Sequence, residues 1–346
     1  MASACSITEV SRAAGVSIST VSHVLNGTRY VSPALRARVQ EAIERLGYRH
    51  NGLARSLRTR RSYAMGLIIP DVCNPYYPQL ARGVQDAADA AGYSVFLCNS
   101  DRRPENEVRL LTALEERRVD GVILDAGGPH ELLLAALHRA AVPVVLVGSR
   151  VDDPAFDMVT VAPHGGYDAV RYLLALGHRR IGLIAGAPVP SASGGREARG
   201  GSDARPAKAS GYLQALAEAD IPPEPMLMVE GDYTREGGQA AMRQLLALDA
   251  PPTAVFAAND LMAIGALHAA RAAGWRVPAD VAIIGYDDIP EAAVTSPALT
   301  TVAVPKYEMG YAATELLLER FTAGEAGARA PRRVVLPYEL VVRETA

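Results

Sequence analysis

Residues 6–27 read SITEVSRAAGVSISTVSHVLNG and predict two short helices joined by a tight turn. Ser6-Ile7-Thr8-Glu9 is a capping box, in which the serine and the glutamate satisfy free N–H groups at the start of a helix. Gly15 is expected to end that helix, Ser17 to begin the next one, and Asn26-Gly27 to end it. This spacing is typical of a helix-turn-helix.

A third helix is predicted after Ser32-Pro33, because proline is tolerated in the first helical turn. Gly47 is expected to end it. Its predicted core face consists of Leu35, Val39, Ile43 and Leu46. A small structural three-helix cap is the alternative interpretation. The second helix argues against a cap, because its outward side chains are small or hydrogen-bonding and suit contacts with base edges in the major groove. These side chains are Ile18, Ser19, Thr20, Ser22 and His23.

Charge is distributed unevenly along the chain. Residues 1–61 hold ten arginines, no lysine and three glutamates, a net charge of +7. Because the whole chain of 346 residues carries −3, the rest carries −10. A basic head on an acidic body indicates a nucleic-acid-binding module joined to another domain, although a solvated basic tail is the alternative.

The body alternates short apolar runs with helical stretches, which indicates parallel sheets with helices on both faces. The predicted strands are Ala64–Ile69, Ser94–Leu97, Gly121–Leu124, Val142–Val147, Ile181–Ile184, Met226–Val229, Ala254–Phe256 and Val281–Ile284. The fold class is therefore α/β with an all-α N-terminal headpiece, and the length of the body predicts two lobes. The expected domains are a helical headpiece at 1–48, a connecting segment at 49–61 and a two-lobed body at 62–346.

Motifs for catalysis are missing from this sequence. It has no Gly-rich dinucleotide loop, P-loop, Cys/His zinc pattern or G-x-S-x-G. We therefore expect no enzyme activity, no cofactor and no metal. The three cysteines lack a C-x-x-C spacing and fit a reducing compartment. With no signal-peptide pattern and no long apolar run, a cytoplasmic protein without membrane contact is expected.

The head resembles the N-terminal DNA-binding headpiece of the lactose-repressor (LacI) family of bacterial transcription regulators. The resemblance rests on residues 7–17 (ITEVSRAAGVS), 20–27 (TVSHVLNG), Val31-Ser32-Pro33 and 51–57 (NGLARSL). The family usually has arginine where this chain has His23. Arginine reads guanine with two hydrogen bonds and histidine makes at most one good one, so the operator preference is expected to differ.

The hinge that the resemblance implies folds into a helix on DNA, and a leucine at the position of Leu57 wedges into the minor groove. A flexible linker is the alternative interpretation. The predicted DNA-contacting residues are Ser17, Ile18, Ser19, Thr20, Ser22, His23, Asn26, Arg29, Tyr30, Asn51, Ala54 and Leu57.

The body resembles the ligand-sensing core of the same family, which is similar to type I periplasmic sugar-binding proteins. The resemblance rests on Gly66–Asp71, Asn74–Tyr77, Val119–Ile123, Leu176–Gly182 and Gly285–Asp288, with further matches at 258–265 and 296–302. It implies that the chain crosses three times between the lobes. It also implies effector contacts from strand ends, where Arg205 and Lys208 are rivals for one basic position. The predicted effector-binding residues are Asp71, Tyr76, Tyr77, Asp125, Arg205, Lys208, Tyr233, Asn259 and Asp287.

These features predict a DNA-binding regulator, a repressor that binds a palindromic operator as a homodimer. Carboxylates and an amide around an aromatic ring favour a sugar or sugar derivative as the effector. An α/β sugar- or nucleotide-processing enzyme with a basic head is the alternative. Architectural DNA binding without a ligand is a third hypothesis.

Overall fold

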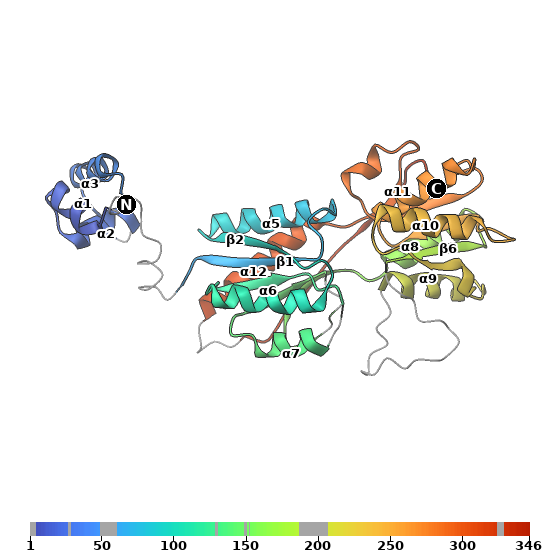
Figure 1. Ribbon diagram of the computed structural model, residues 1–346, viewed down its shortest axis with the longest axis horizontal. Helices are drawn as coiled ribbons and strands as arrows, with labels where there is room; N and C mark the ends of the chain where they lie inside the picture. Colours follow the sequence, from blue (N-terminus) through green and yellow to red (C-terminus); the bar gives the residue numbers. More distant parts are fainter. Residues whose placement is uncertain are drawn as a thin grey trace. The chain divides into compact units, whose positions relative to one another are not determined.

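The computed structural model describes residues 5–26, 29–48, 61–128, 131–148, 151, 153–186, 207–323 and 329–346. The chain forms two compact units, Met1–Ser62 and Tyr63–Ala346. In the first unit the described elements are helices, and in the second strands alternate with helices (Figure 1). The division of the first unit into a headpiece and a hinge stays a prediction, because residues 49–60 lie outside the described part of the chain.

The described part of the first unit contains three helices: α1 (Ile7–Ala14), α2 (Ile18–Asn26) and α3 (Pro33–Leu46). The predicted capping box of α1 is confirmed. The Ser6 Oγ accepts a hydrogen bond from the Glu9 backbone N–H at 3.3 Å, and the Glu9 carboxylate accepts one from the Ser6 N–H at 2.7 Å. The order and type of these elements are those expected of a helix-turn-helix.

The turn after α1 needs glycine. Gly15 has a φ of 61°, and a Cβ there would lie 2.8 Å from Nη2 of Arg38. That guanidinium donates to the Ala14 carbonyl at 2.6 Å and so joins the end of α1 to α3. The core of this unit consists of Val10, Ala14, Val21, Val24, Val39 and Ala42.

The predicted core face of α3 is wrong at its C-terminal end. Leu46 is 37% exposed, whereas Ala42 is buried. The reason is length, because α3 has 14 residues and α1 and α2 have 8 and 9. Ile43, one turn earlier than Leu46, still packs against the core, so burial ends before the last residue of α3.

Two six-stranded sheets form the second unit, in the orders β11-β5-β4-β3-β1-β2 and β12-β10-β9-β8-β6-β7. The first sheet consists of β1 (Ala64–Ile69), β2 (Ser94–Asn99), β3 (Gly121–Leu124), β4 (Val144–Val147), β5 (Asp157–Val161) and β11 (Arg333–Leu336). The second consists of β6 (Ile181–Ala185), β7 (Met228–Glu230), β8 (Ala254–Ala257), β9 (Ala282–Asp287), β10 (Thr300–Ala303) and β12 (Glu339–Val341). Neighbouring strands run parallel, except that β10 and β12 are antiparallel.

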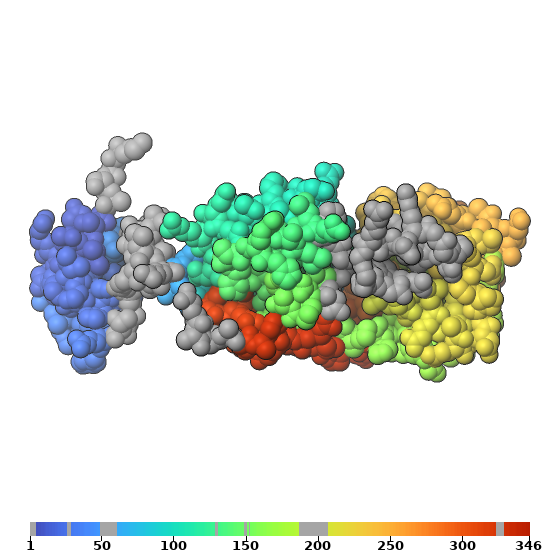
Figure 2. Space-filling view, turned by 90° about the horizontal axis from the view of Figure 1, so that it is seen from below, coloured from blue at the N-terminus to red at the C-terminus, as the bar shows by residue number. Residues whose placement is uncertain are grey.

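Each sheet carries helices on both faces (Figure 1). Lobe 1 holds the first sheet with α5 (Tyr76–Ala90), α6 (Pro104–Glu116), α7 (Glu131–Arg139) and α12 (Lys306–Ala323). Lobe 2 holds the second sheet with α8 (Gly165–Ala175), α9 (Ala207–Glu218), α10 (Arg235–Leu246) and α11 (Asp260–Ala272). Although α12 comes late in the chain, it packs against α5, β3, β4 and β5, and its red segment lies beside green ones in Figure 2.

The chain crosses between the lobes three times, as expected. The crossings follow β5, β10 and β11 and occupy residues 162–164, 304–305 and 337–338. Each lobe is therefore assembled from separated segments, and the carboxyl ends of strands from both lobes are available to one site.

The strands predicted from sequence are present, with ends shifted by up to three residues. Four further strands, β5, β10, β11 and β12, escape prediction. The first residue of β5, Asp157, is a buried carboxylate that accepts hydrogen bonds from Arg320 at 2.6 Å and from Arg329 at 3.2 Å. The charged first residues of β5, β11 and β12 interrupt the apolar pattern on which strand prediction depends, and β10 has two polar threonines at its start.

Candidate nucleic-acid interface and effector site

The start of α2 presents a cluster of hydroxyl groups. The Ser17 Oγ accepts a hydrogen bond from the Thr20 N–H at 3.1 Å and lies 2.7 Å from the Ser19 Oγ and 2.8 Å from the Thr20 Oγ1. Ser17 and Ser19 are exposed, and the apolar Ile18 between them is 47% exposed. An N-terminal helix end that offers hydroxyls and one apolar side chain fits contacts with phosphates and base edges.

The other described residues predicted to contact DNA differ in exposure. Ser22 and His23 are half-buried on α2, whereas Arg29 and Tyr30 are exposed beyond it. The ring of Tyr30 is 88% exposed and is therefore available for a contact. Asn26 is the last residue of α2. Asn51, Ala54 and Leu57 lie outside the described residues.

The predicted effector residues of the second unit lie at carboxyl ends of strands. Asp71 follows β1, Asp125 follows β3 and Tyr233 follows β7. Asn259 follows β8, and Asp287 is the last residue of β9. This is the edge at which open α/β sheets bind ligands.

On the lobe 1 side, a tyrosine pair surrounds a buried carboxylate. The Tyr77 hydroxyl donates to Oδ2 of Asp125 at 3.1 Å, and the Tyr76 ring meets the Tyr77 ring edge-on at 5.0 Å. Burial raises the pKa of Asp125 to about 7, against the lowering effect of the Tyr77 hydrogen bond. The carboxyl group of Asp125 therefore changes its protonation near neutral pH. Asp71 lies further out, and its Oδ1 accepts from the Cys73 N–H at 3.0 Å.

On the lobe 2 side, Lys208 lies against Asp287. The ammonium donates to the Ala258 carbonyl at 2.7 Å, lies 3.4 Å from Oδ1 of Asp287 and sits 3.7 Å from the centroid of the Tyr286 ring. Burial raises the pKa of Asp287, and the charge of Lys208 opposes that rise. The rival basic residue, Arg205, lies outside the described residues.

The side-chain amide of Asn259 uses both its oxygen and its nitrogen in structural hydrogen bonds. Its Oδ1 accepts from the Met262 N–H at 2.9 Å and caps α11. Its Nδ2 donates to the Tyr233 carbonyl at 3.1 Å. Asn259 thus holds the turn that carries Tyr233, while Tyr233 itself is half-buried.

Two basic residues at this edge were missed from the sequence, Arg102 and Lys306. The guanidinium carbon of Arg102 lies 4.7 Å from the centroid of the Tyr233 ring, so a residue of lobe 1 contacts one of lobe 2. Lys306 donates to the carbonyls of Asp287, Asp288 (3.1 Å) and Val304 (3.3 Å). Both positions carried a usable signal, because Arg102 follows β2 at the same carboxyl edge and Lys306 directly follows the second crossing.

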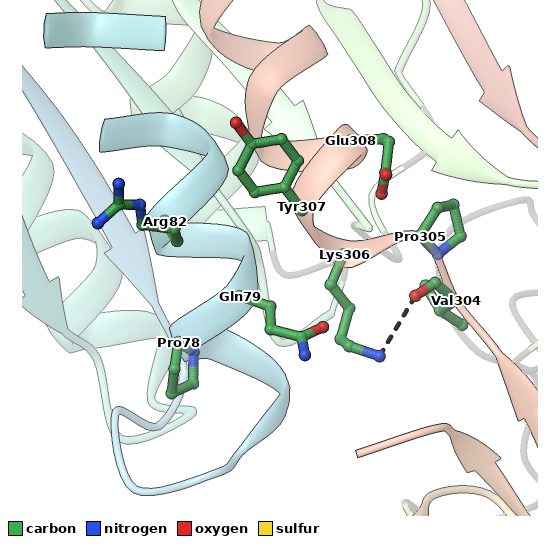
Figure 3. A pocket seen from close by; sticks show the side chains of 8 residues that line it. All are labelled: Pro78, Gln79, Arg82, Val304, Pro305, Lys306, Tyr307 and Glu308. Carbon is green, nitrogen blue, oxygen red and sulfur yellow. Dashed lines mark hydrogen bonds between the residues drawn. The ribbon is translucent and has the colours of Figure 1, made fainter. Parts of the chain in front are cut away.

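An open surface pocket of about 480 Å³ lies between α5 and the start of α12. Figure 3 shows Lys306 at this pocket with its ammonium turned toward the Val304 carbonyl. The other lining residues are Pro78, Gln79, Arg82, Pro305, Tyr307 and Glu308. The predicted effector residues are not among the residues that line it, although Lys306, which lines it, also donates to the carbonyl of Asp287.

Comparison with known proteins agrees with this arrangement. The model of bacterial regulatory proteins of the lacI family matches residues 6–51, and the model of a periplasmic binding protein-like domain matches residues 170–346. The chain is 37% identical over 335 residues to catabolite control protein A of Priestia megaterium, which covers 95% of this chain and 97% of that protein. The chain belongs to the LacI family. A LacI-family relative, the transcriptional repressor PurR of Edwardsiella ictaluri, is 39% identical over 326 residues, 93% of this chain and 92% of that one.

Solved structures of LacI-family regulators share the fold. The lac repressor dimer bound to operator and the anti-inducer ONPF superposes with a TM-score of 0.84 at 27% identity, covering 99% of both chains. The complex of the regulator CelR with cellobiose superposes with a TM-score of 0.71 at 34% identity, covering 99% of this chain and 100% of that one.

LacI-family membership decides between the functional alternatives. PurR and the lac repressor are named repressors and CelR a transcriptional regulator, so this chain, as a member of their family, is a DNA-binding transcription regulator and not an enzyme. Regulators of this family bind operator DNA and small-molecule effectors, often as dimers. Among the described residues, no helix is both long and apolar enough to cross a membrane.

Proposed function

We propose that this protein is a homodimeric repressor that binds a palindromic operator in the bacterial cytoplasm and responds to a sugar or sugar derivative bound between lobes 1 and 2. The observation that carries the proposal is the convergence of Asp125, Tyr233 and Asp287 at strand ends of both lobes. Carboxylates accept hydrogen bonds from sugar hydroxyls, and the C–H face of a sugar packs on an aromatic ring.

The DNA-binding part of the proposal rests on α2 and the basic head. Ser17, Ile18 and Ser19 are exposed at the start of α2, where they would meet base edges and phosphates. Asn51, Ala54 and Leu57 are proposed to form the hinge contact in the minor groove. His23 in place of the family's usual arginine would alter the preferred operator.

The regulatory step requires a difference in effector affinity between two states. A ligand shifts an equilibrium only if it binds one state more tightly. Because the proposed contacts come from both lobes, an effector would favour one lobe arrangement, and that arrangement would change how the two hinges of the dimer meet the operator.

A salt titration tests the DNA-binding part. Duplexes that bind the full chain are selected from a random pool, and their affinity is measured between low and high salt. The logarithm of affinity is expected to fall with the logarithm of salt concentration by about 0.9 for each phosphate contact. A flat response would contradict DNA binding by the basic head.

A thermal-shift screen tests the effector. Cellobiose, ribose, other sugars and a purine base are each added to the full chain, and a ligand at 100 times its Kd stabilises by about 2.7 kcal/mol. For the compound that binds, Tyr233→Ala and Asp287→Ala are expected to weaken binding and leave operator affinity intact. Asp249→Ala is the matched control, since this exposed carboxylate precedes β8 and lies away from the carboxyl ends. Wild-type response in both site variants would show that the site lies elsewhere, and a purine as the only binder would overturn the sugar assignment.

A further inference from the structure

Within the described residues, a cation–aromatic contact joins the two lobes at the carboxyl edges of their sheets. Arg102 follows β2 of lobe 1, and Tyr233 follows β7 of lobe 2. The guanidinium carbon lies 4.7 Å from the centroid of the tyrosine ring, within the range of a cation–π interaction. The two residues are far apart in sequence, so the contact reports directly on how the lobes approach each other.

Both partners sit on strained turns of the same kind. Asp101 and Arg102 have φ values of 56° and 57°, and Asp232 and Tyr233 have φ values of 55° and 66°. Left-handed conformations cost a residue with a Cβ about 1–2 kcal/mol, so two in succession persist only when neighbouring groups hold them.

Those neighbouring groups are present on both sides. In lobe 1, Nδ2 of Asn99 donates to Oδ1 of Asp101. In lobe 2, Oδ1 of Asp232 accepts from the Thr234 N–H at 3.0 Å, and Asn259 donates to the Tyr233 carbonyl at 3.1 Å. Strain that is maintained at both ends of one contact motivates a functional hypothesis for that contact.

The surroundings leave little of the Tyr233 ring open. A Cβ on Gly186 would lie 2.0 Å from Cζ and 2.1 and 2.5 Å from the two Cε atoms of Tyr233, so the glycine backbone packs directly on the ring. Arg102 lies over the ring as well. Within the described residues, Nη2 of Arg102 is buried without a hydrogen-bond partner, and the nearest carboxylate oxygen, of Asp71, is 3.9 Å away. Among the described residues, the stack on Tyr233 is the contact that this guanidinium makes with lobe 2.

We propose that Arg102 is an interlobe latch: it caps the Tyr233 ring when no effector is bound, and an effector that stacks on Tyr233 must displace it. The second half of this statement rests on the proposed function. The latch makes Arg102 a positioning residue that sets the effector concentration needed for a response, because each ligand competes with the guanidinium for the same ring.

Hydrogen exchange of the ligand-free full chain tests the latch. Arg102→Ala is expected to speed exchange of the amides at 230–236, in the other lobe, by about 2- to 30-fold. This range corresponds to the free energy of a cation–π contact. The matched control is Arg103→Ala, which removes the same charge from an exposed neighbour whose side chain makes no cap bond to α6. Unchanged exchange at 230–236, or an equal rise in both variants, would overturn the proposal.

The reciprocal variants keep the test decisive if Arg102→Ala does not fold. Tyr233→Leu removes the ring and is expected to speed exchange at 99–104 in lobe 1, whereas Tyr233→Phe keeps the ring and the protection. Equal exchange in the two tyrosine variants would contradict the latch. Since this experiment uses neither DNA nor effector, its failure is distinguishable from failure of operator or sugar binding.

Discussion

Replacing Asp125 by asparagine is expected to change how the stability of the chain depends on pH. The side chain of Asp125 is 8% exposed and accepts a hydrogen bond from Tyr77 at 3.1 Å. Burial raises the pKa of this carboxyl group from an ordinary value of 3.8 to about 7. In the folded chain the group therefore holds its proton through most of the acidic range, whereas the unfolded chain loses it early.

The sign of the effect follows from this difference in bound protons. Between the two pKa values the folded state binds more protons than the unfolded state, so the free energy of unfolding falls as pH rises. Below both values the contribution of Asp125 vanishes, and well above pH 7 the loss is complete. With a folded pKa of about 7, linkage predicts a loss of about 2 kcal/mol between pH 5.5 and pH 8.5. Asparagine does not titrate, so Asp125→Asn is expected to gain about 2 kcal/mol relative to the wild type over that interval.

Urea unfolding of the full chain, followed by circular dichroism at both pH values, measures this gain. Comparing the variant with the wild type at two pH values cancels any change in packing, which does not depend on pH. Asp71→Asn is the matched control, since it removes a carboxylate from the same edge where the side chain is 36% exposed. If the difference between Asp125→Asn and wild type is the same at both pH values, Asp125 is ionised in the folded chain and the burial argument is refuted.

Three further predictions concern the head, lobe 1 and the hinge. Ser6→Ala removes the capping box of α1 and is expected to lower the stability of the helix by about 1 kcal/mol. Hydrogen exchange of the α1 amides is then expected to become about 5-fold faster, and unchanged exchange would count against the cap. Gly83→Ala places a Cβ 2.0 Å from the Tyr307 carbonyl oxygen, where α5 packs on α12, so the helices must shift. The free energy of unfolding, measured in urea, is expected to fall by about 1–3 kcal/mol, and an unchanged midpoint would disprove this. Leu57→Ala is expected to lower operator affinity and operator bending while affinity for random DNA is kept at matched salt, since charge and helix propensity are retained; equal weakening on both DNAs would exclude the wedge.

The headpiece shows what local sequence rules can decide. The Ser6–Glu9 capping box, the Gly15 turn and the start of α2 depend on groups within a few residues of one another, and all three form as predicted. Leu46 is the exception in this unit, because its exposure depends on how far α1 and α2 reach along α3. That is a property of packing rather than of helical spacing.

In the second unit, the sequence by itself determined the alternation of strands and helices. Because ligands bind at the carboxyl ends of parallel strands, it also determined the sheet edge that carries Asp125, Tyr233 and Asp287. Apolar runs and strand order along the chain are local, so they can be read without coordinates. Tertiary structure alone decided which residues from that edge meet. Arg102 stacks on Tyr233 and Lys306 joins three carbonyls near Asp287, because three crossings bring separated segments together. The raised pKa of Asp125 likewise comes from burial by groups distant in sequence, and desolvation of that kind leaves no trace in the pattern of neighbouring residues.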